Sequence, residues 1–270
     1  PKTIANRIIK KVEDVCPIYR MATRYNIKGT LSIPYYADDG KTITMAYADE
    51  FKSLTSTSGK FTNIELTGYL AGALSKVSKS LANNSQFDIV SFVVNEMSES
   101  IARFLEKELL HGSDSKVDGL KGVTISVTAA AESAVTMDEI ITLKDKVKDA
   151  FQAKAVFIMN SATRTALRLL KDGNSRYLMQ DDITSPFGTT LLGKPVYVSD
   201  QMDGMEKGKT AIYYGDMSGL AVKLSEDASV QVLQERYADE HAIGVIAWME
   251  FDAKVENAQK IAKLVMKTSD

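Results

Sequence analysis

The sequence predicts an α+β fold, on the basis of three stretches. Residues 155–217 have the pattern of a strand, a helix, a loop and two further strands, beginning with the apolar, β-branched run 155–159. Residues 86–110 keep apolar side chains at a helical period, and a helix of that length extends for about 40 Å. Residues 29–66 have no helical period and show the turn and edge signals of extended chain.

The first thirty residues predict a cationic amphipathic helix. Thr3 can cap a helix over residues 3–15, whose apolar side chains recur at three- and four-residue steps: Ile4, Ile8, Val12 and Val15. Cations outnumber the two acidic residues of this stretch, and they are Lys2, Arg7, Lys10, Lys11, Arg20, Arg24 and Lys28. These charges indicate either an arm that meets a neighbouring subunit or nucleic acid, or the solvated face of a terminal helix.

Residues 29–66 predict a ribbon rather than a central strand. The run 31–36 leads into a hairpin-turn signal at 38–41. Pro34 cannot donate to a β-ladder, which places its strand at an edge. Residues 53–60 are rich in Ser, Thr and Gly and have little to bury. The segment is therefore either an arm that lies on another subunit or a meander at the edge of a self-contained domain.

The strongest helix signal lies at residues 86–110, after a strand pattern over 61–77. Its apolar stripe has a 3.6-residue period and consists of Val90, Val94, Met97, Ile101, Phe104 or Leu105, and Leu109. Its opposite face is polar and consists of Asn95, Glu96, Glu99, Arg103 and Lys107. Gly112, directly after His111, is the residue at which we expect the helix to end.

Two shorter helices and several strands are predicted in the second half. Residues 136–139 form a capping box, which opens an amphipathic helix that extends to Phe151. Residues 160–161 offer N-caps for a helix over 162–171, which Gly173 ends. The remaining apolar runs predict strands, at residues 191–200, 211–217, 220–224, 230–233, 241–251 and 260–266.

Motifs for catalysis or cofactor binding are weak. Residues 188–194 have the spacing of a phosphate-binding loop, but Pro195 stands where a magnesium-binding Ser or Thr and a helix start are needed. The histidines, His111 and His241, are far apart, and Cys16 has no nearby His, which gives neither zinc spacing nor an activated nucleophile. We expect no cofactor, no metal and no enzymatic activity.

Composition sets broad limits. A chain of 270 residues has the size of one large domain or two closely packed ones. Its net charge of -2 gives no global attraction to nucleic acid or an acidic membrane, and no apolar run approaches the roughly 20 residues that span a bilayer. A single cysteine fits a reducing interior. Pro1 fits either removal of an initiator Met or cleavage of a longer precursor.

Short motifs follow one another across residues 155–217, and their order is more specific than any one of them. They are Met159-Asn160, Ala162-Thr163, Leu191-Leu192-Gly193-Lys194-Pro195-Val196, Ser199-Asp200 and Tyr214-Gly215-Asp216-Met217. This order resembles the axial domain of tailed-bacteriophage major capsid proteins, which have the Hong Kong 97 fold.

The resemblance implies a division of the chain into named parts. They are an N-terminal arm (1–28), an extended β-hairpin loop (29–66), a peripheral domain with a long spine helix (67–117 and 226–257), and an axial domain (118–225 and 258–270). The loop would be draped over the adjacent subunit.

The resemblance also implies a function. It predicts a major capsid protein that self-assembles into pentamers and hexamers of an icosahedral shell enclosing double-stranded DNA, in a virion assembled in the bacterial cytoplasm. Expected partners are copies of itself, scaffolding, portal and decoration proteins, and packaged DNA without sequence preference. The charged residues expected at subunit interfaces are Arg7, Lys10, Lys11, Glu50, Lys52, Lys60, Glu96 and Arg103. The alternatives are an encapsulin-like nanocompartment shell protein and a soluble α/β enzyme.

Some members of the family join their subunits through an isopeptide bond between a loop lysine and an asparagine, with a glutamate nearby. Aligning the last long strand places His241 at the asparagine position and Trp248 at the glutamate position, with Glu250 two residues away. Lys52 and Lys60 lie in the loop. We expect no such bond in this chain.

Overall fold

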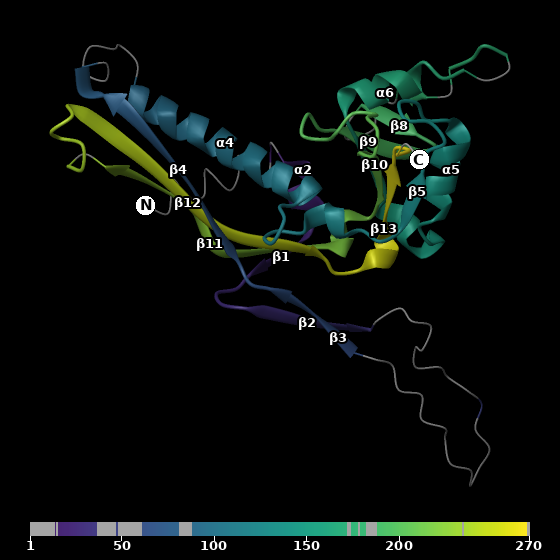
Figure 1. Ribbon diagram of the computed structural model, residues 1–270, viewed down its shortest axis with the longest axis horizontal. Helices are drawn as coiled ribbons and strands as arrows, with labels where there is room; N and C mark the ends of the chain where they lie inside the picture. The colour runs from purple at the N-terminus through teal and green to yellow at the C-terminus, as the bar shows by residue number, and fades with distance from the viewer. Residues whose placement is uncertain are drawn as a thin grey trace, which may run out of the picture.

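The subunit is elongated, with a different sheet at each end (Figure 1). The computed structural model describes residues 14, 16–36, 47, 61–80, 88–171, 174–177, 179–181, 188–233 and 235–268. The turn predicted at 38–41, the polar stretch 53–60 and nearly all of the helix predicted over 3–15 lie outside these ranges. A four-stranded sheet with a long helix along it forms one end, and a seven-stranded sheet with two short helices forms the other.

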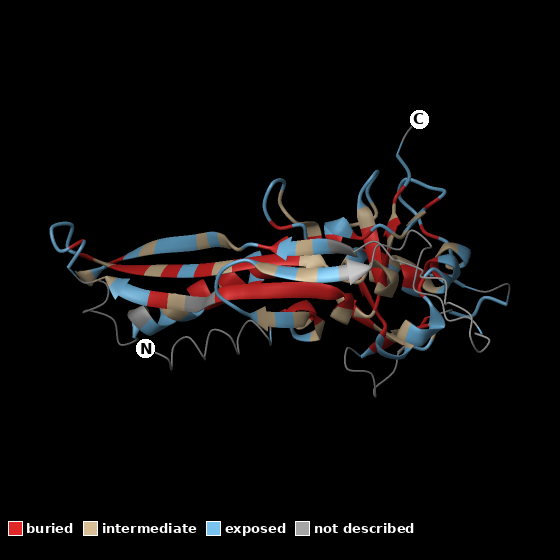
Figure 2. Ribbon diagram, turned by 90° about the horizontal axis from the view of Figure 1, so that it is seen from below, coloured by how far each residue is buried: buried red, intermediate tan, exposed pale blue. Residues whose placement is uncertain are grey.

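The four-stranded sheet has the order β1–β11–β12–β4. Its strands are β1 (Thr23–Asn26), β4 (Tyr69–Ser78), β11 (Leu220–Leu233) and β12 (Ala242–Val255). β1 is parallel to β11, and the other pairs are antiparallel. Along β12, Val245, Ala247, Met249 and Phe251 point into the core, and exposed or half-buried residues alternate with them, as the two-residue period of a half-buried strand requires (Figure 2).

Helix α4 (Ile89–His111) lies along the buried face of this sheet. The predicted stripe is confirmed, because Met97, Ile101, Leu105 and Leu109 are all buried. Of the two candidates that follow Ile101 in the stripe, Leu105 packs in the core and Phe104 remains 43% exposed. Asp88 caps the start by accepting from the amide of Ser91 at 3.1 Å, and Gly112, with φ of 62°, ends the helix as predicted.

Part of the segment predicted as an N-terminal arm packs within the subunit. Helix α2 (Pro17–Met21) contacts α4, and its Ile18 and Tyr19 are buried in the same core. Cys16, at the N-cap position of α2, is fully buried, and burial raises the pKa of its thiol to about 12. It is therefore an apolar filler of the core, as its sequence context predicts.

The seven-stranded sheet has the order β5–β13–β10–β6–β9–β8–β7. Its strands are β5 (Ser126–Thr128), β6 (Val156–Met159), β7 (Gln180–Asp181), β8 (Thr189–Leu191), β9 (Lys194–Val198), β10 (Thr210–Gly215) and β13 (Ile261–Val265). Val156 and Ile158 of β6 join the core that includes α4, whereas Phe157 and Met159 face the core beneath α5 and α6. The sheet is therefore covered on both faces, which explains why β6 is apolar at every position.

Both short helices end earlier than the sequence predicts. Helix α5 (Met137–Asp145) begins at the predicted capping box, but it stops before Phe151 because the side-chain amide of Gln152 donates to the carbonyls of Lys144 and Val147, at 2.9 Å each. Helix α6 (Ser161–Arg168) is capped by Asn160 as predicted. It ends before Lys171, which pairs with Tyr177 in a β-bridge.

The chain crosses between the two sheets three times. The first crossing leads from α4 through η1 (Gly119–Gly122) into β5, and the other two lie beside each other. β10 leads through η3 (Met217–Gly219) into β11, and β12 leads through η4 (Ala258–Lys260) into β13. The amides of Glu256 and Asn257 donate to the Gly219 carbonyl at 2.8 and 3.1 Å, and the Asp216 amide donates to the Lys260 carbonyl at 3.0 Å. The crossings through η3 and η4 are therefore bonded to each other.

The predicted strands of the C-terminal third are present with different limits. The two runs at 220–224 and 230–233 belong to one strand, β11, whose pairing with β12 shifts register near Glu226. Hydrogen bonding therefore joins residues 220–225, predicted as axial, and Thr23–Asn26, predicted as arm, to the four-stranded sheet. The division into domains otherwise stays a prediction.

Candidate assembly surfaces

The ribbon predicted at residues 29–66 is a sheet of its own. β2 (Leu31–Tyr36) pairs antiparallel with β3 (Phe61–Leu66), and the pair stands away from the body below the four-stranded sheet (Figure 1). Pro34 is exposed and lies opposite Asn63. The arrangement is that of a projecting arm rather than a meander in the edge of a larger sheet. Strand β4 follows β3 after a break at Thr67 and Gly68, where the sequence predicted one continuous strand.

The four-stranded sheet has large apolar side chains on the face opposite α4. Leu70 and Leu74 of β4 are 64% and 48% exposed, and Trp248 of β12 is 42% exposed. Trp248 lies opposite Gly72, and a Cβ on Gly72 would stand 2.4 Å from its ring carbons, so glycine leaves room for the indole. Neighbouring exposed apolar side chains of this size are typical of a surface that another chain covers.

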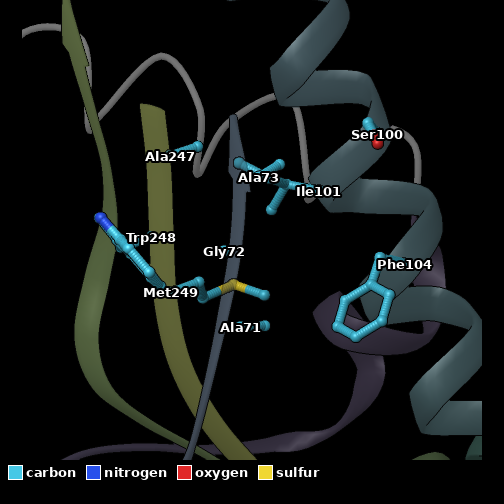
Figure 3. Close-up of a pocket in the computed structure, with 9 residues that line it drawn as sticks. All are labelled: Ala71, Gly72, Ala73, Ser100, Ile101, Phe104, Ala247, Trp248 and Met249. Atoms are coloured by element: carbon cyan, nitrogen blue, oxygen red, sulfur yellow. The ribbon is translucent and has the colours of Figure 1, made fainter. Parts of the chain in front are cut away.

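A small apolar pocket lies between α4 and this sheet (Figure 3). Ser100, Ile101 and Phe104 line it from the helix, and Ala71 and Ala73 line it from β4. Its volume is about 230 Å³, and it exists because small β4 side chains face a helix with a partly exposed phenylalanine. Figure 3 shows the side chain of Trp248 on the other side of the sheet from Phe104.

The predicted interface residues divide into two groups. Glu96 and Arg103 lie on the exposed side of α4, and Arg103 Nη2 is 3.4 Å from Glu99 Oε2 one turn away. The others lie outside the described residues: Arg7, Lys10, Lys11, Glu50, Lys52 and Lys60. Their role at an interface therefore stays a prediction.

Residues considered for catalysis or nucleotide binding have structural contacts. His111 Nε2 is 2.6 Å from the carbonyl oxygen of Gln201, and His241 lies in an exposed turn with φ of 51°. Lys194 donates to the Gln152 carbonyl and begins strand β9, as the composition predicted, rather than a helix. Within the described ranges, no group of three or more His, Cys, Asp or Glu side chains could hold a metal ion. Nor does any described helix have the length and apolarity to cross a membrane.

A buried polar cluster, which the sequence does not reveal, joins α4 to the seven-stranded sheet. Glu106 of α4 accepts hydrogen bonds from the hydroxyl of Tyr197 and, at 2.9 Å, from that of Ser199. One turn on, the Leu110 carbonyl accepts from the Tyr213 hydroxyl at 3.1 Å. Burial raises the pKa of Glu106, and burial together with the neighbouring Glu106 carboxylate raises the pKa of Tyr197.

The raised pKa of Glu106 predicts a pH-dependent stability. Its contribution is fully present below its unfolded-state pKa, near 4.5, and is lost as the pH rises through the folded-state pKa. Glu106→Gln keeps an acceptor for both hydroxyls without the buried charge. We expect this variant to melt at a higher temperature than wild type at about pH 8, with the difference shrinking toward about pH 4. Thermal melts followed by circular dichroism measure it.

Glu96→Gln is the matched control, because it removes an exposed carboxylate from the same helix. It should leave the melting temperature nearly unchanged at both pH values. A Glu106→Gln chain less stable than wild type at the higher pH would mean that the ionised carboxylate, held by its two hydroxyl donors, stabilises the fold.

Solved capsid structures share this fold. The capsid of an empty GTA particle, with C5 symmetry, superposes with a TM-score of 0.79 at 21% identity, over 93% of this chain and 89% of that chain. The capsid of the native GTA particle superposes with a TM-score of 0.80 at 20% identity, over 93% of this chain and 90% of that chain. A structure from Microbacterium phage Oxtober96 superposes with a TM-score of 0.71 at 16% identity, over 94% of this chain and 91% of that chain. No curated protein matches the chain.

These likenesses define the fold as that of a shell-forming capsid subunit, and the α+β prediction is confirmed. A model of the phage capsid family matches residues 1–266, and the chain belongs to that family. It is a major capsid protein, a structural protein of the virion shell that associates with copies of itself. The family and the role as a major capsid protein, predicted from the order of motifs at 155–217, are therefore confirmed.

Proposed function

We propose that this protein forms pentamers and hexamers that close into an icosahedral shell around double-stranded DNA. The projecting ribbon is the main support. An isolated two-stranded ribbon is marginal in water, so β2 and β3 need a surface to lie on. Ile33 pairs with Ile64 on one side of the ribbon and both are half-buried, so this side has apolar surface to present; Leu66, on the same side and nearer the body, is already buried in its own subunit.

The exposed apolar face of the four-stranded sheet also supports the proposal. Leu70, Leu74 and Trp248 form a surface of the kind that protein contacts cover. The interface residues predicted from the sequence remain part of the proposal, including Glu96 and Arg103 on α4. Contact with DNA would be weak and independent of sequence, because the net charge of the chain is -2. Assembly in the bacterial cytoplasm, with scaffolding, portal and decoration proteins, completes the proposal.

Electron microscopy of the purified protein in negative stain tests the proposal. We expect closed particles tens of nanometres wide, and particles from infected cells should protect DNA from nuclease. A monomer or dimer in sedimentation velocity under all assembly conditions would contradict it. Closed particles that hold protein cargo and no DNA would favour the encapsulin-like alternative.

The subunits of such a shell should remain uncrosslinked. Glu250, the glutamate nearest the predicted cross-linking position, lies at the foot of the ribbon, where a Cβ on Gly68 would stand 2.4 Å from its Oε1 atom. We expect boiled particles to run as one band near 29.6 kDa on a denaturing gel. A ladder of dimers and larger species would show that the alignment of β12 with cross-linking relatives is wrong.

A further inference from the structure

The foot of the ribbon is the place where its two ends join the body, at Gly29 before β2 and at Thr67 and Gly68 after β3. A buried lysine there forms hydrogen bonds to both of these ends. Lys223 lies on β11 and is 0% exposed. Its ammonium donates to the carbonyl of Gly29, just before β2, and to the carbonyl of Thr67, just after β3, at 2.5 Å. A single cation therefore fixes the two places at which the ribbon joins the body.

A buried carboxylate stands opposite this lysine on the next strand. Asp252 of β12 pairs with Lys223 across the sheet and is also 0% exposed. Its Oδ2 accepts from the Thr67 amide at 2.8 Å, and its Oδ1 accepts from the Ala253 amide at 2.8 Å. The peptide groups on both sides of Thr67 are thus bonded, one by Lys223 and one by Asp252.

The backbone at the foot has the freedom to turn. Gly29 has φ of 80° and Gly68 has φ of 114°, conformations that side chains disfavour. A Cβ on Gly68 would stand 2.8 Å from Ser225 Oγ, so this leg passes directly over the sheet. Nearby, the pairing of β11 with β12 shifts register at Glu226. The foot is therefore held by polar side chains at a place where its own backbone is permissive.

Stability alone does not account for two buried charges at this place. Replacing buried charged groups by apolar side chains of similar size is often neutral or stabilising, because desolvation offsets much of the gain from the bonds. Charge-assisted hydrogen bonds are, however, strong and directional. Lys223 and Asp252 are therefore better suited to fixing the direction of the ribbon than to increasing the stability of the core.

We propose that Lys223 and Asp252 act as a pin that sets the angle at which the ribbon leaves the sheet, and through it the curvature of the shell. The part of this proposal that concerns curvature rests on the proposed function, in which the ribbon lies on a neighbouring subunit. A six-residue strand extends for about 20 Å, so a rotation of about 10° at the foot moves its far end by about 3 to 4 Å. Such a shift changes which surface the ribbon meets.

The buried hydroxyl of Ser225 fits this role. It has no hydrogen-bond partner among the described residues and lies beside the leg at Gly68. It is an unused donor at the foot, available to the ribbon in a second position. A ribbon that turned about Gly68 would therefore meet a free hydroxyl in place of part of the bonding it gives up.

Distance measurements between spin labels on unassembled subunits test the pin directly. The labels go on cysteines introduced at Asn63 of the ribbon and Ala162 of α6, which are both exposed, while the native Cys16 is buried and stays unlabelled. Lys223→Met removes the ammonium at nearly constant volume. Lys76→Met is the matched control, because Lys76 lies on the same sheet and pairs with Glu240 at the surface.

Wild type and Lys76→Met should give one narrow distance distribution, and Lys223→Met a broad one. Hydrogen exchange at the Thr67 amide should be at least about tenfold faster in Lys223→Met, because bonds to charged groups restrain this peptide. If Lys223→Met does not melt cooperatively, Asp252→Asn takes its place, with a smaller broadening expected because its amide oxygen still accepts. A narrow distribution in a folded Lys223→Met or Asp252→Asn chain would overturn the pin.

Assembly of the same variants tests the second part of the proposal, that the angle of the ribbon sets the curvature of the shell. Lys76→Met should form particles of the wild-type diameter, and Lys223→Met should form open or variably sized ones. A broad ribbon distribution together with wild-type particles would show that the ribbon angle does not set curvature. Wild-type subunits that never assemble would contradict the proposed function instead, while the distance measurement on free subunits would still decide the pin.

Discussion

Replacing residues 37–60 with a short Gly-Ser turn is expected to abolish closed shells while leaving a soluble subunit that melts cooperatively. The two hydrophobic cores that the described residues form are built from side chains outside this segment, and we expect them to remain in place. The segment has few large apolar residues, and ordering each residue costs roughly 1–2 kcal/mol of backbone entropy. The surface that offsets this cost should therefore belong to another subunit.

Sedimentation velocity and circular dichroism together decide this prediction. A chain in which residues 37–60 are shuffled is the control, because it keeps length and composition and should also fail to close shells. A deletion that unfolds the subunit would place the segment in the core of its own chain. Shells that still close would mean that the main contact between subunits lies elsewhere, for example on the exposed face around Trp248.

Gly215→Ala is expected to lower stability more than an alanine at any other glycine that the structure describes. Gly215 is buried at the end of β10 with φ of 146°, and an added Cβ would stand 2.0 Å from the carbonyl oxygen of Lys260. The clash is with backbone on the neighbouring crossing, which cannot move without breaking the bond from the Asp216 amide. Backbone strain and overpacking together should lower the free energy of unfolding by about 3 kcal/mol or more.

Thermal or denaturant melts measure this effect, and a loss of that size corresponds to a fall of about 6 °C or more in melting temperature. Gly204→Ala is the matched control, since nothing lies within 4 Å of its added Cβ and its φ is not positive. That substitution should be neutral or slightly stabilising. Equal melting temperatures for the two variants would mean that the crossing at Gly215 relaxes easily.

The sequence predicts α4 well because its evidence is local. A stripe of apolar residues at a 3.6-residue period, followed by Gly112, needs no knowledge of the rest of the chain. The same pattern cannot choose between Phe104 and Leu105, since both lie near the edge of the stripe and the sheet decides which one is buried. The end of α5 is missed for a related reason, because a side chain beyond the helix, that of Gln152, binds its last carbonyls.

The foot of the ribbon could not be predicted from the sequence. Lys223 and Asp252 stand in alternating strand patterns, where a charged residue is ordinarily assigned to the solvent face. The carbonyls that Lys223 binds lie 194 and 156 residues away along the chain. Pairings over such separations leave no periodic signal in one sequence, so the projecting ribbon is predictable and the bonds that aim it are not.

The two bonded crossings between the sheets give the subunit a particular mechanical response. A tensile load that pulls the two sheets apart is shared by three covalent connections, and the bonds at Gly219 and Lys260 tie two of them together, so that neither of these two stretches alone. The ribbon, by contrast, is aimed by a few polar bonds at its foot. Under internal pressure, a shell of such subunits would deform first at the contacts between subunits. Each subunit would move nearly as a rigid body.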